Sequence, residues 1–176
     1  MRCNLFGAMA LGITWLGLGT GMAQQQAAQN PLDVIPDQMP FNAPYGQPIA
    51  LAQAQAAIQA VLDEANRRHW PEDIAVVGPS GDLIAFARMD GAQLASISIA
   101  QHKARTAARY RRPTVVFENA VQKSDYKYIL SLDDVIASRG GIPLMSDGKL
   151  IGAIGCSGGT GSQDEALCKT GAATVK

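Results

Sequence analysis

Apolar residues recur every three or four positions in several stretches of the chain, which is the spacing of one face of an α-helix. The first such stretch ends before Trp70-Pro71, because proline disfavours a helical conformation in the residue before it. The second repeats alanine on one face, from Ala100 to Ala108. Residues 124–134 are typical of either a short helix or a loop. Helices are therefore predicted at residues 51–68, 96–110, 114–122 and 163–173.

Short apolar runs between these helices have the length and the flanking turns of β-strands. They cover residues 73–78, 83–89, 142–146 and 149–156. Asp147-Gly148 is a strong two-residue hairpin signal between the last two, and residues 79–82 form a turn between the first two. Pro143 predicts an edge strand or the start of its own strand, because proline cannot donate to a neighbouring strand. Hairpins separated by helices predict an α+β domain, with helices packed on an antiparallel sheet.

The segment LIGAIGCSGGTGSQD, residues 150–164, predicts a strand, a glycine loop and the start of a helix. Ser162 with Glu165 fits a capping box, and the amides at a helix start favour anions. The spacing matches neither a P-loop nor a dinucleotide-binding motif. It nearly imitates G-x-S-x-G, but no histidine follows, which argues against a serine hydrolase. The loop is therefore either an anion site or a tight turn without a ligand.

The N-terminal part of the chain has a different composition. Arg2, an apolar stretch and Gly21-Met22-Ala23 predict a signal peptide at residues 1–23. The apolar stretch is short for a membrane span, so we expect no stable membrane anchor after cleavage and a periplasmic or secreted protein. A retained anchor is the alternative. Residues 24–47, rich in Gln and Pro, predict a linker or arm, and residues 48–176 the folded domain.

Export changes the interpretation of the cysteines. Cleavage of the signal peptide removes Cys3 and leaves Cys156 and Cys168, an even number in an oxidising compartment. One lies at the end of a predicted strand and the other in the helix that follows it. A helix that folds back over its own strand can bring them together, so we expect a Cys156–Cys168 disulfide, with two buried free thiols as the alternative.

The 15 basic and 15 acidic residues give no net charge, which argues against nucleic acid as a partner. A basic stripe nevertheless follows one side of the second predicted helix, at His102, Arg105, Arg109 and Arg112. His102 is a candidate axial ligand of haem iron, with arginines holding the propionates. The alternative is a solvated basic helix face.

Two further glycine-bearing junctions, Met89-Asp90-Gly91 and Gly140-Gly141, can meet the glycine loop. Asp90 and Asp164 are possible acids or bases there, but no nucleophile–base pair emerges, so no catalytic residue is assigned. The candidate ligand-binding residues are His102, Lys103, Arg105, Arg109, Met89, Asp90, Gly141, Ser157, Gly158, Gly159 and Asp164.

Four segments together resemble the GlcG/HbpS-like haem-binding family, which is related to the C-terminal domain of PduO-type proteins. They are IAVVGPSGDLIAFARMDGA, IAQHKARTAARYRRPT, SRGGIPL and IGAIGCSGGTGSQDEALC, within residues 74–168. The resemblance implies a profilin-like three-layer α/β/α arrangement with a central antiparallel sheet flanked by helices. It also implies homo-oligomers, often octamers, and haem binding in some members. Cys156 and Cys168 depart from the family's usual small residues, which fits the expected disulfide.

Two functions follow. The first is an exported, non-catalytic haem- or tetrapyrrole-binding accessory protein for storage, sensing or transfer. The second is a protein of organic-acid catabolism that binds or converts a small anionic ligand at the glycine loop. Both require the glycine loop and the basic helix to meet around one cavity.

Overall fold

The computed structural model describes residues 35–39 and 41–176, so the predicted signal peptide lies outside the described residues. Residues 39–176 form one unit. Within the described part of the chain, every helix is too short or too polar to span a lipid bilayer. The elements in chain order are α1 (Leu51–Arg68), β1 (Asp73–Val77), β2 (Leu83–Arg88), α2 (Ser96–Arg109), α3 (Val115–Ser124), the 3₁₀ helix η2 (Lys127–Ser131), β3 (Gly141–Ser146), β4 (Lys149–Ser157) and α4 (Gly161–Ala172).

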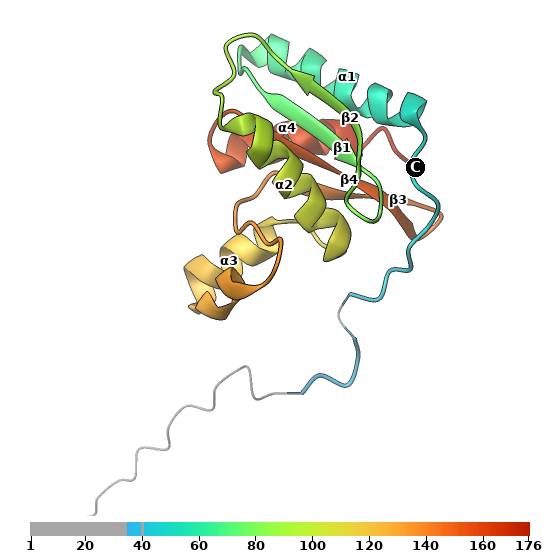
Figure 1. Cartoon of the computed structure of the whole chain (residues 1–176), viewed down its shortest axis with the longest axis vertical. Helices are drawn as coiled ribbons and strands as arrows, with labels where there is room; N and C mark the ends of the chain where they lie inside the picture. The colour runs from blue at the N-terminus through green and yellow to red at the C-terminus, as the bar shows by residue number, and fades with distance from the viewer. Residues whose placement is uncertain (1–34, 40) are drawn as a thin grey trace, which may run out of the picture. The chain divides into compact units, whose positions relative to one another are not determined.

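The four strands form one antiparallel sheet in the order β2-β1-β4-β3. In the centre, β1 pairs with β4 so that Asp73 lies opposite Ser157 and Val76 opposite Ile154. Helix α2 crosses one face of the sheet, whereas α1 and α4 cover the other (Figure 1). The expected α+β fold with three layers is therefore confirmed, and Pro143 lies in an edge strand as predicted.

Side chains of β1 alternate between two separate hydrophobic cores. Ile74 and Val76 point into the larger core with α1 and α4, and Ala75 and Val77 into the core with α2. All five residues of β1 are buried, as its continuous apolar sequence predicts. The larger core includes Val61, Ile154 and Leu167, and each such side chain stabilises the fold by about 1.5–3 kcal/mol.

The contact between α2 and the sheet depends on small residues on both sides. The alanine face of α2, from Ala100 to Ala108, lies directly on β4. A Cβ atom at Gly155 would lie 2.1 Å from the Ala100 carbonyl oxygen, so only glycine allows the helix this close. The backbone of α2 is thereby held against the strand that leads into the glycine loop.

Several local predictions differ from the structure. Helix α4 begins at Gly161, and its capping box consists of Thr160 and Gln163 rather than Ser162 and Glu165. Residues 124–134 contain the 3₁₀ helix η2. Part of the predicted arm pairs with the domain, since the Gly46 amide donates to the Leu150 carbonyl oxygen at 2.7 Å. Tyr45 forms a parallel bridge with Leu150, on the side of β4 that β1 leaves free beyond the Val77–Ala153 pair.

Candidate functional site

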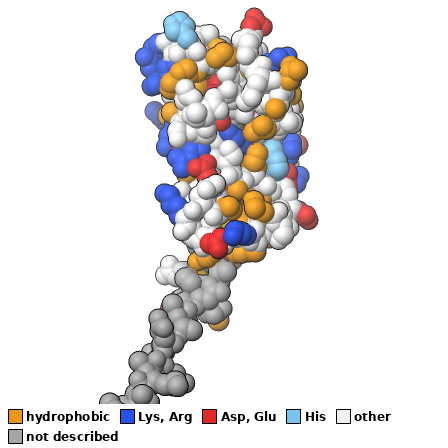
Figure 2. Space-filling model, turned by 90° about the vertical axis from the view of Figure 1, so that its left-hand side faces the viewer, with side chains coloured by type: hydrophobic (Ala, Val, Ile, Leu, Met, Phe, Trp, Pro, Cys, Tyr) orange, Lys and Arg blue, Asp and Glu red, His pale blue; other side chains and the backbone are white. Residues whose placement is uncertain are grey.

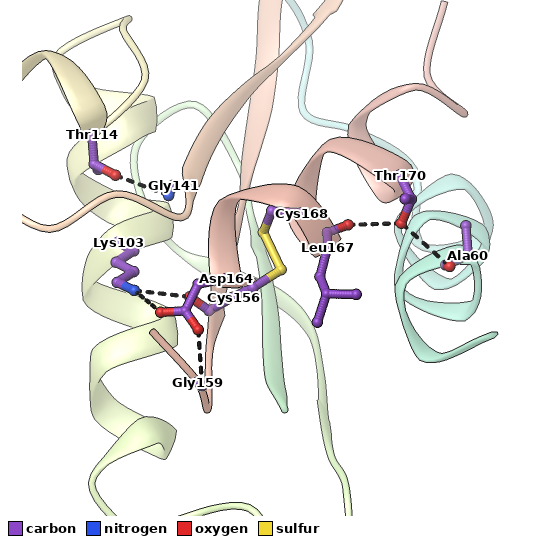
Figure 3. Close-up of a disulfide and its surroundings, with 10 residues drawn as sticks. All are labelled: Ala60, Lys103, Thr114, Gly141, Cys156, Gly159, Asp164, Leu167, Cys168 and Thr170. Carbon is purple, nitrogen blue, oxygen red and sulfur yellow. Dashed lines mark hydrogen bonds and ion pairs between the residues drawn. A yellow bond between two sulfur atoms is a disulfide. The ribbon is translucent and has the colours of Figure 1, made fainter. Parts of the chain in front are cut away.

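Lys103 joins α2 to the glycine loop in the interior of the domain. Its side chain is only 1% exposed. The Lys103 Nζ atom donates to Asp164 Oδ2 at 2.5 Å and to the Cys156 carbonyl oxygen at 3.1 Å (Figure 3). The predicted meeting of the cationic helix with the glycine loop therefore occurs, and it takes the form of a buried ion pair.

Asp164 occupies the position that an anionic ligand would need. The Gly159 amide donates to Asp164 Oδ1 at 3.0 Å, and the Thr160 amide donates to Gln163 Oε1 at 2.9 Å. A carboxylate at a helix N-terminus is stabilised by such amides. Because the protein supplies its own carboxylate, these two amides and Lys103 are already paired, and the arrangement does not favour a small anion at the loop.

Two further carboxyl groups are buried: that of Glu72, beside this pair, and that of Asp73. Among the described residues, none forms a hydrogen bond to any of their four oxygen atoms. The pKa of Glu72 is raised to about 9, first by burial and then by the neighbouring Asp164 carboxylate, while Lys103 opposes the increase. Burial also raises the pKa of Asp73, against the charge of Arg88. Glu72 is thus held as a neutral acid near pH 7.

The loop packs tightly on the segment that carries Glu72. A Cβ atom at Gly158 would lie 2.1 Å from the Pro71 carbonyl oxygen. The Ser157 hydroxyl donates to the Ser96 hydroxyl at 3.1 Å. Gly141 lies on the other side, where its amide donates to Thr114 Oγ1 at 2.9 Å (Figure 3). This bond explains why Thr114, the N-cap of α3, makes no side-chain cap.

The part of the basic stripe that lies on α2, His102, Arg105 and Arg109, is on a different side of the helix and shares a single acid. Asp134 Oδ2 lies 2.8 Å from Arg109 Nη1, and Asp134 Oδ1 lies 3.4 Å from Arg105 Nε. The His102 Nε2 atom is buried 3.4 Å from Asp134 Oδ1 and makes no hydrogen bond within the part of the chain that the structure describes. Ligation of iron through His102 Nε2 would therefore require Asp134 to move. The role of His102 stays a prediction.

The remaining candidates do not join either group through their side chains. Met89 packs against the larger core, and its amide donates to the Glu72 carbonyl oxygen at 3.0 Å. Asp90 is exposed. The candidates therefore divide into a buried cluster around Lys103 and a half-exposed group around Asp134, rather than lining one cavity.

The sulfur atoms of Cys156 and Cys168 form a disulfide in the structure (Figure 3). The bond ties the second turn of α4 to the end of β4. It lies next to the Lys103 cluster, because the Cys156 carbonyl oxygen accepts from Lys103. The geometry is that expected from the sequence, and its oxidation in the mature protein stays a prediction.

Three hollows on the described surface lie away from the glycine loop. One, of about 480 Å³, is lined by Tyr45, Pro79, Ser80 and Arg109 at the end of α2. Another, of about 510 Å³, lies between α1 and β2. A third, of about 390 Å³, lies between α3 and η2. None of these three is lined by the glycine loop, so they do not supply the cavity that the sequence predicted there.

The α3–η2 hollow, the third of these, has an unusual lining. Its walls include Phe117 and Ile129, with the aromatic rings of Tyr126 and Tyr128 and the guanidinium group of Arg112. Hydrophobic side chains are exposed among charged ones on the side of the molecule that carries α3 (Figure 2), and Tyr128 is 52% exposed. The sequence pattern missed this site because its residues come from two separate elements of irregular spacing.

A four-stranded antiparallel sheet between helical layers, with a buried lysine–carboxylate cluster beside its central strands, defines a small three-layer α+β domain. A family profile described as "Haem degrading protein HbpS-like" matches residues 49–173. The chain belongs to this HbpS-like family.

Individual relatives agree with this assignment. An uncharacterised 15.0 kDa protein from the dhaT-dhaS intergenic region of Citrobacter freundii is 38% identical over 125 residues, which cover 69% of this chain and 88% of that protein. Protein GlcG of Escherichia coli K12 is 38% identical over 104 residues, covering 59% and 77%. The crystal structure of a PduOC:haem complex superposes with a TM-score of 0.68 at 28% identity, covering 73% of this chain and 96% of that one.

Proposed function

We propose that this protein is an exported, non-catalytic haem- or tetrapyrrole-binding accessory protein that acts as a homo-oligomer. The observation that carries the proposal is the fold shared with PduOC, which was crystallised with haem, at 28% identity over 73% of this chain. Membership of the HbpS-like family supports it. Export is supported by the sequence of residues 1–23 and by the two mature cysteines that the structure pairs.

The buried cluster supports a binding role over a catalytic one. Lys103 and Asp164 satisfy each other, and both are almost fully buried. A catalytic acid or base must reach its substrate directly or through one water molecule. The cluster lies in the packed interior, where its charges hold α2, β4 and α4 together.

Titration of the purified mature protein with haemin tests the proposal. A saturable shift of the Soret band with a fixed stoichiometry is expected, and binding should also raise the thermal midpoint, since a ligand that binds only the native state stabilises it. Absence of a saturable band would refute the proposal. His102→Asn tests ligation by α2, with His69→Asn as the matched control, because His69 is the exposed C-cap of α1 and asparagine tolerates its left-handed backbone.

A further inference from the structure

The α3–η2 hollow contains a guanidinium group that no acid neutralises. Among the described residues, Arg112 forms no ion pair; its Nε atom donates to the Tyr110 carbonyl oxygen at 2.9 Å. The guanidinium carbon lies 3.4 Å from the Phe41 ring centroid and 5.3 Å from that of Phe117. Burial lowers the pKa of Arg112, and the neighbouring Arg111 lowers it further. An anion beside Arg112 would therefore be favoured, because it supplies the missing countercharge.

The basic groups on α2 differ from Arg112 in this respect. Arg105 and Arg109 share Asp134, and Arg109 also donates to the Ser80 carbonyl oxygen at 2.8 Å. The His102 Nε2 atom is buried against the same carboxylate. A ligand on the α2 face would have to displace these contacts, whereas a ligand in the α3–η2 hollow would displace none of them.

The hollow also offers surfaces suited to a flat, conjugated molecule. Apolar side chains form much of its lining, and its volume of about 390 Å³ lies within the range of small-molecule sites. The rings of Tyr126 and Tyr128 lie 6.2 Å apart, and neither hydroxyl has a hydrogen-bond partner among the described residues. A tyrosine oxygen is an established type of haem-iron ligand.

We propose that the α3–η2 hollow is the tetrapyrrole site, in which Arg112 binds a propionate and Tyr126 or Tyr128 supplies an oxygen ligand to ferric iron. This inference rests on the proposed haem-binding function and names its site. The apolar lining would hold the macrocycle. The phenol releases its proton to solvent as its oxygen binds the iron, and no electron is transferred.

Two probes, with and without iron, distinguish the propionate contact of Arg112 from the iron contact of the tyrosine. Haemin reports propionate binding and iron ligation together, whereas metal-free protoporphyrin IX reports the pocket and Arg112 alone. Arg112→Gln should weaken the binding of both probes about tenfold or more, because it removes the charge-assisted hydrogen bond to the propionate. Arg111→Gln is the matched control, because Arg111 contacts Tyr45 and the Ala43 carbonyl oxygen outside the hollow.

The double variant Tyr126→Phe/Tyr128→Phe should change the absorption spectrum of bound haemin while binding protoporphyrin IX with wild-type affinity. Circular dichroism and thermal melts verify that each variant is folded. Equal binding by Arg112→Gln and Arg111→Gln, or a wild-type haemin spectrum in the double variant, would overturn the assignment. Loss of haem binding in His102→Asn alone would move the site to α2 and leave the proposed function standing, whereas absence of haemin binding by the wild-type protein would refute both.

Discussion

The neutral Glu72 carboxyl makes a specific prediction about stability and pH. Glu72 is fully buried beside Asp164, and its pKa is raised to about 9 by burial first and by that neighbour second. In an unfolded chain the pKa of glutamate is about 4.3. Between these two values the native protein keeps a proton that the unfolded chain releases. Stability should therefore fall as pH rises through this window.

The size of the effect follows from the proton difference. One proton gives a slope of at most about 1.4 kcal/mol per pH unit. From pH 6 to pH 8 the Glu72 contribution alone lowers the free energy of unfolding by up to about 3 kcal/mol. For a domain of this size, this corresponds to a decrease in melting temperature on the order of 10 °C. Below about pH 4 Glu72 is protonated in both the native and the unfolded protein, and above about pH 9 it is ionised in both. Outside this window Glu72 therefore contributes nothing to the change of stability with pH.

Glu72→Gln replaces the neutral acid by a neutral amide of nearly the same shape. Urea unfolding at pH 6 and pH 8, without reductant, should show a flatter pH dependence than wild type and a more stable variant at pH 8. Glu64→Gln is the control, because Arg67 and Arg68 lower the pKa of Glu64 to about 2 and keep it ionised at both pH values. If Glu72→Gln keeps the wild-type slope, Glu72 is ionised in the native protein and the reasoning is wrong.

Three other outcomes are expected. Lys103→Met leaves the buried Asp164 carboxylate without its cation and should cost about 3–5 kcal/mol in urea unfolding, so an unchanged midpoint would contradict the buried pair. Cys156 and Cys168 should resist alkylation without reductant, and reduction should cost roughly 3 kcal/mol for a loop this short; free thiols in the intact mass would disprove the pairing. Gly155→Ala should destabilise by about 3 kcal/mol, because the new methyl group would meet the Ala100 carbonyl oxygen, and thermal melts equal to wild type would contradict that contact.

Local sequence patterns determined most of the secondary structure. The predicted helix at residues 51–68 and the strand from residue 73 agree closely with α1 and β1, because periodicity records which side of an element faces the core. The sequence does not determine which residue forms the capping box of α4, because Thr160 and Ser162 each have a glutamine or glutamate three residues later. Thr160 is the N-cap because its extended backbone leads the chain from the loop into α4.

The burial of Lys103 was available from the sequence but missed. Lys103 follows Ala100 by three positions and precedes Ala107 by four, so it shares their face of α2. His102, one residue earlier, lies about 100° around the helix and therefore belongs to another side. His102 and Lys103 are therefore neighbours in sequence, but the geometry of the helix directs them to different sites.

By itself, the sequence determined the α+β class, the order of the elements, the family resemblance and the cysteine pair to be tested. Tertiary structure decided that Asp164 fills the anion position at α4, that Asp134 pairs with Arg105 and Arg109, and that α3 and η2 enclose a hollow beside Arg112. The physical reason is that periodicity is a property of neighbouring residues. Charge pairing and cavity shape instead depend on side chains from distant segments that meet only when the sheet and its helices are packed.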